Sequence, residues 1–241
     1  MSASDRAALL ERFQATAVDE QPLPADYNVA PSKQVYAVLE RTRADEPPLR
    51  ELRIVRWGLI PSWAKDAKIS NRLVNARIET AGQKPSFRAA YARRRCVLPA
   101  DGYYEWYSPA IVGARKQPFY IHAADGQLLA LAGLYEIWRD SDLPPGDPQS
   151  LRWTCTILTT TATDDLGQIH DRAPLLVPTS AFARWLDPSL PDPPSDVLVP
   201  AAPGLLQAQP VATTVNSVRN NGPALIAPLA PTGDACARSG E

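Results

Sequence analysis

The chain of 241 residues is 45% hydrophobic and holds six Trp, which is enough apolar material for a sizeable buried core. Its net charge is −1, and its 25 Pro against 12 Gly exclude a long-helix bundle in favour of many short elements. No apolar run reaches about 18 residues and no basic-then-apolar leader opens the chain, so the sequence predicts no membrane span and no secretory signal. We favour one domain over two small ones, in a soluble protein of the cytoplasm.

Cysteine and histidine are sparse. Cys96, Cys155 and Cys236 are far apart and odd in number, which fits reduced thiols better than a disulfide framework. The only histidines are His122 and His170, and the chain has no Cys-x-x-Cys or His-x-x-x-His pair and no glycine-rich phosphate loop. We therefore expect neither a metal nor a cofactor.

The charged residues are unevenly distributed. Residues 41–100 hold 14 Lys or Arg against 5 Asp or Glu. A basic segment inside a nearly neutral chain indicates a surface that binds a polyanion. A solvated run of surface charge is the alternative.

Two helices are predicted. Ser2 and Asp5 resemble a capping box, and the apolar residues from Leu9 to Phe13 then share one helical face. Near the other end of the chain, Thr179-Ser180 predicts the cap of a helix that runs through Trp185.

Strands are predicted from β-branched and alternating apolar runs. They cover residues 34–40, 49–58, 118–123, 128–135 and 153–160. The third and fourth of these should form a hairpin around Ala124-Asp125-Gly126. From residue 227 onward we expect a flexible tail.

One carboxylate lies among aromatic residues. Glu105 follows an apolar, β-prone run and is flanked by Tyr103, Tyr104 and Trp106. Packing among these rings would remove water from the carboxyl group and raise its pKa toward the range useful for proton transfer. The alternative is an outward, solvated Glu on a strand.

Two further positions allow both a structural and a functional interpretation. Trp63 lies in a loop with polar and basic neighbours, where it either anchors the core or stacks on a base of single-stranded nucleic acid. His170 ends a short helical or turn segment beside Asp171 and Arg172, so its proton affinity is adjustable, although a lone His is more often a structural hydrogen-bonding residue.

Six ordered motifs resemble those of the SOS-response-associated peptidase (SRAP) family. They are Tyr27-Asn28-Val29-Ala30-Pro31, Trp57-Gly58-Leu59-Ile60-Pro61-Ser62-Trp63, Asn75-Ala76-Arg77-Ile78-Glu79-Thr80, Pro99-Ala100-Asp101-Gly102-Tyr103-Tyr104-Glu105-Trp106, Ile169-His170-Asp171-Arg172-Ala173-Pro174, and Val215-Asn216 onward. The resemblance implies an α+β fold, with a single compact domain over residues 1–226 and a tail over 227–241. Its mixed, barrel-like β core would be flanked by helices and carry a positively charged groove.

The resemblance also implies an activity. Family members sense abasic sites in single-stranded DNA and trap them in a covalent DNA–protein crosslink. Their nucleophile is a cysteine after the initiator methionine, which is removed autocatalytically. The free amine condenses with the ring-opened sugar aldehyde, and the thiol closes a thiazolidine ring. The implied partner is single-stranded DNA with abasic sites, bound by a monomer.

Roles are implied residue by residue. Asn75 would orient the N-terminal group, Glu105 would shuttle protons during imine formation, and His170 would act as the acid that opens the sugar ring. The residues implied to contact DNA are Arg77 and Arg88, which would hold phosphates, and Trp63, Asn28 and Pro31, which would shape the site where the strand bends.

Position 2 departs from the family pattern. Ser2 stands where the family has cysteine, and the Cys-Gly-Arg strand is absent. We interpret this as a start codon placed too far downstream or an engineered truncation. Cys96 lies next to three arginines that would lower a thiol pKa, but it has no free amine and its surroundings look buried. Two alternatives are a non-catalytic single-stranded DNA-binding module and, ranked last, a general peptidase.

Overall fold

The computed structural model describes residues 1–42, 48–111, 113–144, 146–162, 164–190, 193–198 and 200–229. The strands are β1 Thr16–Ala17, β2 Gln34–Arg41, β3 Leu49–Trp57, β4 Asn75–Arg77, β5 Arg95–Ala100, β6 Tyr103–Tyr107, β7 Gln117–Ala123, β8 Leu129–Arg139, β9 Leu151–Thr161, β10 Arg172–Pro174 and β11 Leu206–Pro210. The α-helices are α1 Arg6–Phe13, α2 Ile78–Ala81, α3 Arg88–Arg93 and α4 Phe182–Leu186. The 3-10 helices are η1 Ala67–Arg72, η2 Pro148–Ser150, η3 Asp164–Gln168, η4 Thr179–Ala181, η5 Ser195–Val197, η6 Thr213–Asn216 and η7 Pro223–Ile226. Most of the predicted tail lies outside the described residues.

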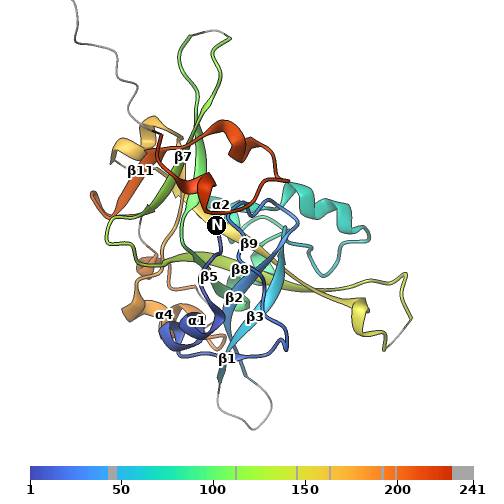
Figure 1. Cartoon of the computed structure of the whole chain (residues 1–241). Coiled ribbons are helices and arrows are strands. Elements are labelled where there is room, and N and C mark those ends of the chain that lie inside the picture. The colour runs from blue at the N-terminus through green and yellow to red at the C-terminus, as the bar shows by residue number, and fades with distance from the viewer. Residues whose placement is uncertain are drawn as a thin grey trace, which may run out of the picture.

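Five strands close into a barrel. The order is β3-β2-β5-β8-β9, and a parallel pairing of β3 with β9 joins the two ends (Figure 1). The other four pairings are antiparallel. Residues 129–136 of β8 are all buried, because this strand lies between the barrel interior and the surrounding elements. The α+β class and the barrel-like core are therefore confirmed.

A second sheet of three antiparallel strands lies beside the barrel, in the order β11-β7-β6. The predicted strands over 118–123 and 128–135 both exist, but their predicted pairing as a hairpin is wrong. A turn at Gly126 does follow β7, where φ is +72°. The chain then crosses to the barrel, since the nearly continuous apolar run of β8 needs burial on both faces.

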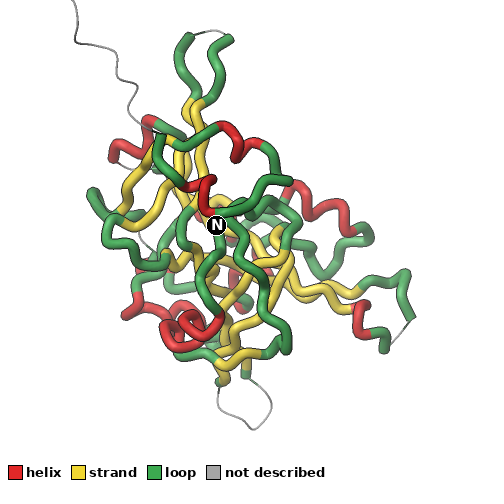
Figure 2. The backbone as a smooth tube through the Cα atoms, viewed as in Figure 1, coloured by secondary structure: helices red, strands yellow, loops and turns green. Residues whose placement is uncertain are grey.

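Helices α1 and α4 pack together on one side of the barrel, and Figure 2 shows short helical segments around the central strands. Phe13 of α1 stacks on Phe182 of α4 with ring centroids 5.2 Å apart, and the two helices are neighbours in Figure 1. Trp185 of α4 is fully buried and donates a hydrogen bond from Nε1 to the carbonyl of Cys96 (2.9 Å). This bond fixes α4 against β5.

Both predicted helix caps are wrong. Asp5, not Ser2, caps α1 through a side-chain hydrogen bond from the Ala7 N–H (3.0 Å). Ser2 is instead in extended backbone, paired with Asp26. The second helix begins as a 3-10 turn after Pro178 with no side-chain cap, and it ends at Leu186.

The chain passes from the barrel to the second sheet at Asp101 and Gly102, between β5 and β6. A Cβ on Gly102 would lie 2.5 Å from the carbonyl oxygen of Ile121 and 2.5 Å from the ring of Tyr120. Only glycine fits this close approach. Asp101 also accepts hydrogen bonds from the Ala3 N–H (2.8 Å) and the Ser4 hydroxyl (2.5 Å), so the N-terminal segment is held at the same junction.

Candidate functional site

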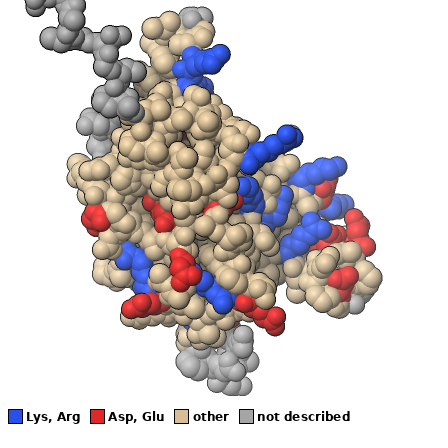
Figure 3. All heavy atoms as spheres, viewed as in Figure 1, with Lys and Arg blue, Asp and Glu red and all other residues tan. Residues whose placement is uncertain are grey.

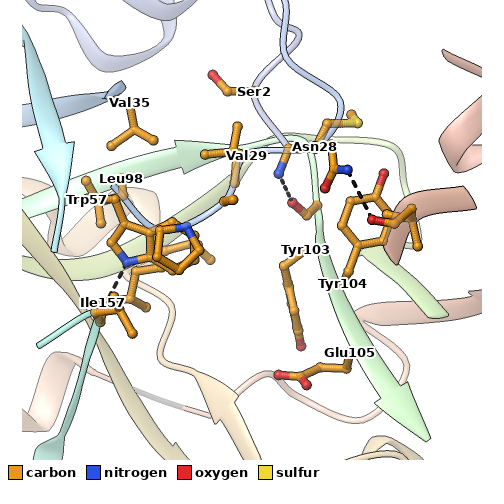
Figure 4. Close-up of a pocket in the computed structure, with 18 of the residues that line it drawn as sticks. Ser2, Asn28, Val29, Val35, Trp57, Leu98, Tyr103, Tyr104, Glu105 and Ile157 are labelled. Carbon is orange, nitrogen blue, oxygen red and sulfur yellow. Dashed lines mark hydrogen bonds between the residues drawn. The ribbon is translucent and has the colours of Figure 1, made fainter. Parts of the chain in front are cut away.

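A pocket of about 400 Å³ lies where the barrel meets the second sheet. Its inner wall is apolar and comes from four barrel strands, which contribute Val35, Trp57, Leu98 and Ile157 (Figure 4). Its polar lining includes Asn28, Asn75 and Glu105. A largely apolar cavity with a few convergent polar groups is the usual form of a binding or active site.

Glu105 faces this pocket from β6. Burial raises the pKa of its carboxyl group above the ordinary value, while the nearby charge of His170 and the Trp106 N–H oppose that rise. In Figure 4 the carboxylate points toward the far end of the Tyr103 ring. A larger fraction of this carboxyl group is therefore protonated near neutral pH than in an exposed Glu, so it can both give and take a proton.

His170 lies next to the pocket and not among its lining residues. It follows η3, and its ring is 44% exposed, with Nδ1 3.4 Å from the Asp171 carboxylate. The ring is close enough for its charge to lower the pKa of Glu105. The structure thus brings His170 and Glu105 within electrostatic reach across 65 residues of sequence.

Asn75 opens β4 and lines the pocket. β4 pairs with β9 in parallel, which sets Asn75 opposite Ile157 of the apolar wall. Two of the three predicted catalytic residues, Asn75 and Glu105, therefore share one cavity, with His170 at its side.

Among the predicted DNA contacts, Asn28 and Pro31 line the pocket. Asn28 is only 6% exposed, and its side-chain nitrogen donates to the carbonyls of Val215 (3.1 Å) and Ser217 (3.0 Å). It thereby fastens the segment that begins with η6 to the pocket wall. The side chain shapes the site through the protein itself.

Arg77, Arg88 and Trp63 lie outside the pocket and are exposed. Trp63 is 58% exposed, and its ring nitrogen donates to the Pro85 carbonyl (3.3 Å), so it is no core anchor. The exposed basic residues of this part of the chain are Lys65, Lys68, Arg72, Arg77, Lys84, Arg88 and Arg93. Figure 3 shows Lys and Arg side chains gathered on the right-hand side of the face it presents. The Arg93-Arg94-Arg95 triplet is divided, because Arg95 is 1% exposed and binds the Trp185 carbonyl (2.8 Å).

The N-terminal residues reach the same cavity, since both Met1 and Ser2 line it. The Met1 α-amino group donates to the Gly102 carbonyl (2.8 Å). Burial lowers the pKa of this amine to about 6, against the opposing effect of Asp101 and Asp26. An amine with that pKa is mostly neutral at pH 7, which is the form that attacks a carbonyl carbon.

Cys96 does not have the surroundings of a reactive thiol. It is fully buried in β5, and desolvation raises the pKa of its thiol well above the ordinary value. The neighbouring arginines therefore do not activate it, contrary to the effect expected of them from the sequence.

Two findings on the described residues concern other classes of protein. In the ranges that the structure describes, no three His, Cys, Asp or Glu residues are grouped as metal ligands. Within the same ranges, none of the helices has the length and apolar character needed to span a membrane.

Sequence reasoning missed two side-chain pairs at the site. The Trp106 ring nitrogen donates to Asn216 Oδ1 (2.8 Å), which joins the second sheet to η6 at the pocket. Arg172 forms a two-pronged ion pair with Glu79 (2.8 and 2.9 Å). Both pairs join motifs that the sequence analysis identified, but their partners lie 110 and 93 residues apart.

The closed mixed barrel and the pocket that holds Glu105 can now be assigned to a class of proteins by comparison with known families. The family model for SOS response associated peptidase (SRAP) matches residues 1–218, and the chain belongs to this family. A Bacillus subtilis relative, "Abasic site processing protein YoqW", is 39% identical over 202 residues, which cover 83% of this chain and 84% of the relative. "Abasic site processing protein YedK" of Escherichia coli is 32% identical over 216 residues, covering 88% and 87%. A crystal structure of a Bordetella bronchiseptica protein matches with a TM-score of 0.68 and 29% identity, covering 88% of this chain and 97% of that one.

Proposed function

We propose that the protein recognises abasic sites in single-stranded DNA at this pocket, and that the site captures the exposed sugar aldehyde covalently when the chain begins with a cysteine. The observation that carries the proposal is the convergence of Asn75, Glu105 and the N-terminal residues on one cavity, with His170 beside it. Support also comes from the relatives, which are named abasic site processing proteins.

The chemistry needs a neutral amine and an acid. The amine lone pair attacks the aldehyde carbon, the nitrogen loses a proton, and the resulting hydroxyl leaves as water once an acid protonates it. Glu105, whose pKa is raised by burial, supplies that proton and can take one back. His170 protonates the ring oxygen of the sugar as the ring opens, and Asn75 orients the amine by hydrogen bonding.

A cysteine at the N-terminus would complete the crosslink. Its thiol adds to the imine carbon, and the thiol proton passes to the imine nitrogen, which closes a thiazolidine. Ser2 stands at that position in this sequence. An amine alone stops at the imine, which water can reverse.

The exposed basic residues supply the DNA-binding surface. Arg77 follows Asn75 by two residues on β4, so a phosphate bound there would lie close to the pocket. Arg88 would hold a second phosphate, and the exposed Trp63 ring offers a face on which a base can stack.

A second candidate follows from Ser2. The protein of this sequence would bind single-stranded DNA without forming a stable covalent bond. Binding that weakens with salt and is lost in Arg77→Ala would support this function, whereas salt-independent or absent binding would reject it.

A denaturing gel separates the two functions. A single-stranded oligonucleotide with one abasic site is incubated with two proteins, one of the printed sequence and one that carries a Met-Cys-Gly-Arg start. We expect a shifted band with the second protein and none with the first. An oligonucleotide without the abasic site is the control, and absence of a band with the Met-Cys-Gly-Arg protein would contradict covalent capture.

A further inference from the structure

Arg172 is held in place by an unusually complete set of contacts. Its two terminal nitrogens donate to the two carboxylate oxygens of Glu79 at 2.8 and 2.9 Å. The same nitrogens reach the Thr159 carbonyl (2.7 Å) and the Thr161 hydroxyl (3.4 Å). All four terminal N–H groups therefore have acceptors within the protein.

The guanidinium group is also largely shielded from solvent. The Arg172 side chain is 19% exposed, and its Nε is buried with no partner among the described residues. Paired planar geometry of this kind is the strongest form of an arginine–carboxylate contact. A phosphate could bind Arg172 only after Glu79 had released it.

The ion pair joins the two halves of the candidate site. Glu79 belongs to α2, directly after β4, which carries Asn75 and Arg77. Arg172 opens β10, two residues after His170. The pair therefore connects the strand that lines the pocket with the turn that carries the histidine.

The backbone of Arg172 then orients the histidine ring. Its N–H lies 3.0 Å from His170 Nδ1, which can accept from it in the neutral ring, and the ring proton is then on Nε2. When Nδ1 is protonated, the Arg172 carbonyl (3.1 Å) and the Asp171 carboxylate (3.4 Å) are the acceptors within reach. Moving the Arg172 backbone would remove its contacts with His170 Nδ1 in both protonation states.

We propose that Arg172, anchored by Glu79, is a positioning residue for His170 and not a phosphate contact. The ion pair holds β10 against α2, so the Arg172 backbone contacts His170 Nδ1 in both states of the ring. Its N–H donates to Nδ1 of the neutral ring, and its carbonyl accepts from Nδ1–H of the charged ring, whose Nε2–H is then the acid. This inference rests on the proposed function for the meaning of His170, but the geometry can be tested without DNA.

The direct test is nitrogen NMR on histidine-labelled protein. The chain has only two histidines, so His122 serves as an internal reference in every spectrum. At a pH where the ring of the unmodified protein is neutral, we expect His170 Nδ1 to resonate as an unprotonated nitrogen and Nε2 as a protonated one. In Glu79→Gln and Arg172→Lys we expect this preference to give way to a mixture of tautomers, with His122 unchanged.

Glu40→Gln is the matched control. Glu40 accepts two hydrogen bonds from Arg50 (2.7 and 2.9 Å) between β2 and β3, with side chains that are 13% and 19% exposed. This variant removes a comparable charge away from His170, so its His170 signals should match those of the unmodified protein. Unchanged His170 signals in Glu79→Gln would overturn the proposal, even if Arg172→Lys failed to fold.

DNA binding distinguishes positioning from phosphate contact. The probe is a single-stranded oligonucleotide with a tetrahydrofuran abasic analogue, titrated at several salt concentrations. A positioning role predicts that Glu79→Gln leaves the affinity and its salt dependence unchanged, while crosslinking by the Met-Cys-Gly-Arg protein slows by about tenfold. A phosphate role predicts tighter binding once Arg172 is released. If the unmodified protein binds no abasic DNA, the proposed function fails while the NMR result stands by itself.

Discussion

The strands β5 and β6 are consecutive in the sequence, yet they differ in how far their residues are buried. All six residues of β5 are buried in the barrel, whereas no residue of β6 is buried. Two residues separate them, and the close packing around Gly102 allows the chain to change sheets there. The stretch from Cys96 to Trp106 therefore divides into a strand that is buried in the barrel and a partly exposed strand that carries Glu105.

This contrast shows how the Glu105 carboxylate can be partly desolvated and still lie in an accessible pocket. Glu105 lies on a half-exposed strand against an apolar wall supplied by the barrel. Buried barrel residues such as Val97 stabilise the fold and do not line the pocket. Changes to residues of β5 that do not line the pocket, such as Val97, should alter stability, and changes to Glu105 of β6 should alter chemistry.

The largest expected effect is that of Glu105→Gln on chemistry. Removal of a general acid and base should slow crosslinking by roughly 100-fold to 10,000-fold. The rate is measured on the Met-Cys-Gly-Arg protein with abasic single-stranded DNA in excess. Thermal stability and affinity for the tetrahydrofuran analogue should be unchanged, and a loss of either would mean that Glu105 has a structural role.

Val97→Ala should show the reverse pattern. Val97 is fully buried in β5, and loss of its two methyl groups should lower the free energy of unfolding by about 2 kcal/mol. Urea unfolding measures this change. The crosslinking rate of the folded protein should stay the same, so a slower rate would break the division between the two strands.

Arg77→Ala should weaken DNA binding without affecting stability. Arg77 is exposed on β4, and loss of one phosphate contact should reduce the slope of log affinity against log salt by about 1. Fluorescence anisotropy at several salt concentrations gives this slope. Arg184→Ala is the control, because Arg184 is exposed on α4, where it pairs with Asp196. An equal slope in Arg77→Ala and the unmodified protein would exclude the phosphate contact.

The smallest expected effect is a shift in a pH profile. Burial lowers the pKa of the Met1 amine to about 6, and only its neutral form attacks an aldehyde. Reductive trapping of abasic DNA by protein of the printed sequence should therefore rise with pH through about 6 and then level off. A rise centred near 8, the ordinary value for an α-amine, would show that the amine is not desolvated.

The sequence predicted local structure better than long-range pairing. β2, β3 and β9 follow from runs of β-branched and apolar residues, and the aromatic neighbours of Glu105 predicted that burial raises its pKa. The strands that pair with β7 could not be predicted, because a turn at Gly126 does not determine which sheet the next strand joins. The choice of Asp5 over Ser2 as helix cap depends on Asp26, which pairs with Ser2 in space.

Charged residues were the hardest to place. Arg93 and Arg95 belong to the same arginine triplet, yet Arg93 is exposed and Arg95 is only 1% exposed. Arg95 is buried because α4 brings the Trp185 carbonyl to it. The pairing of Arg172 with Glu79 likewise arises only when β10 and α2 both pack against β9. No local pattern contains that information.

The central claim is that the pocket beside Glu105 captures an abasic site. The most direct measurement is the denaturing gel with the Met-Cys-Gly-Arg protein and its Glu105→Gln variant, each given an abasic and an intact single-stranded oligonucleotide. We predict a shifted band only with the abasic strand, and one that forms far more slowly in the variant. A band with the intact strand, or equal rates for the two proteins, would contradict the account.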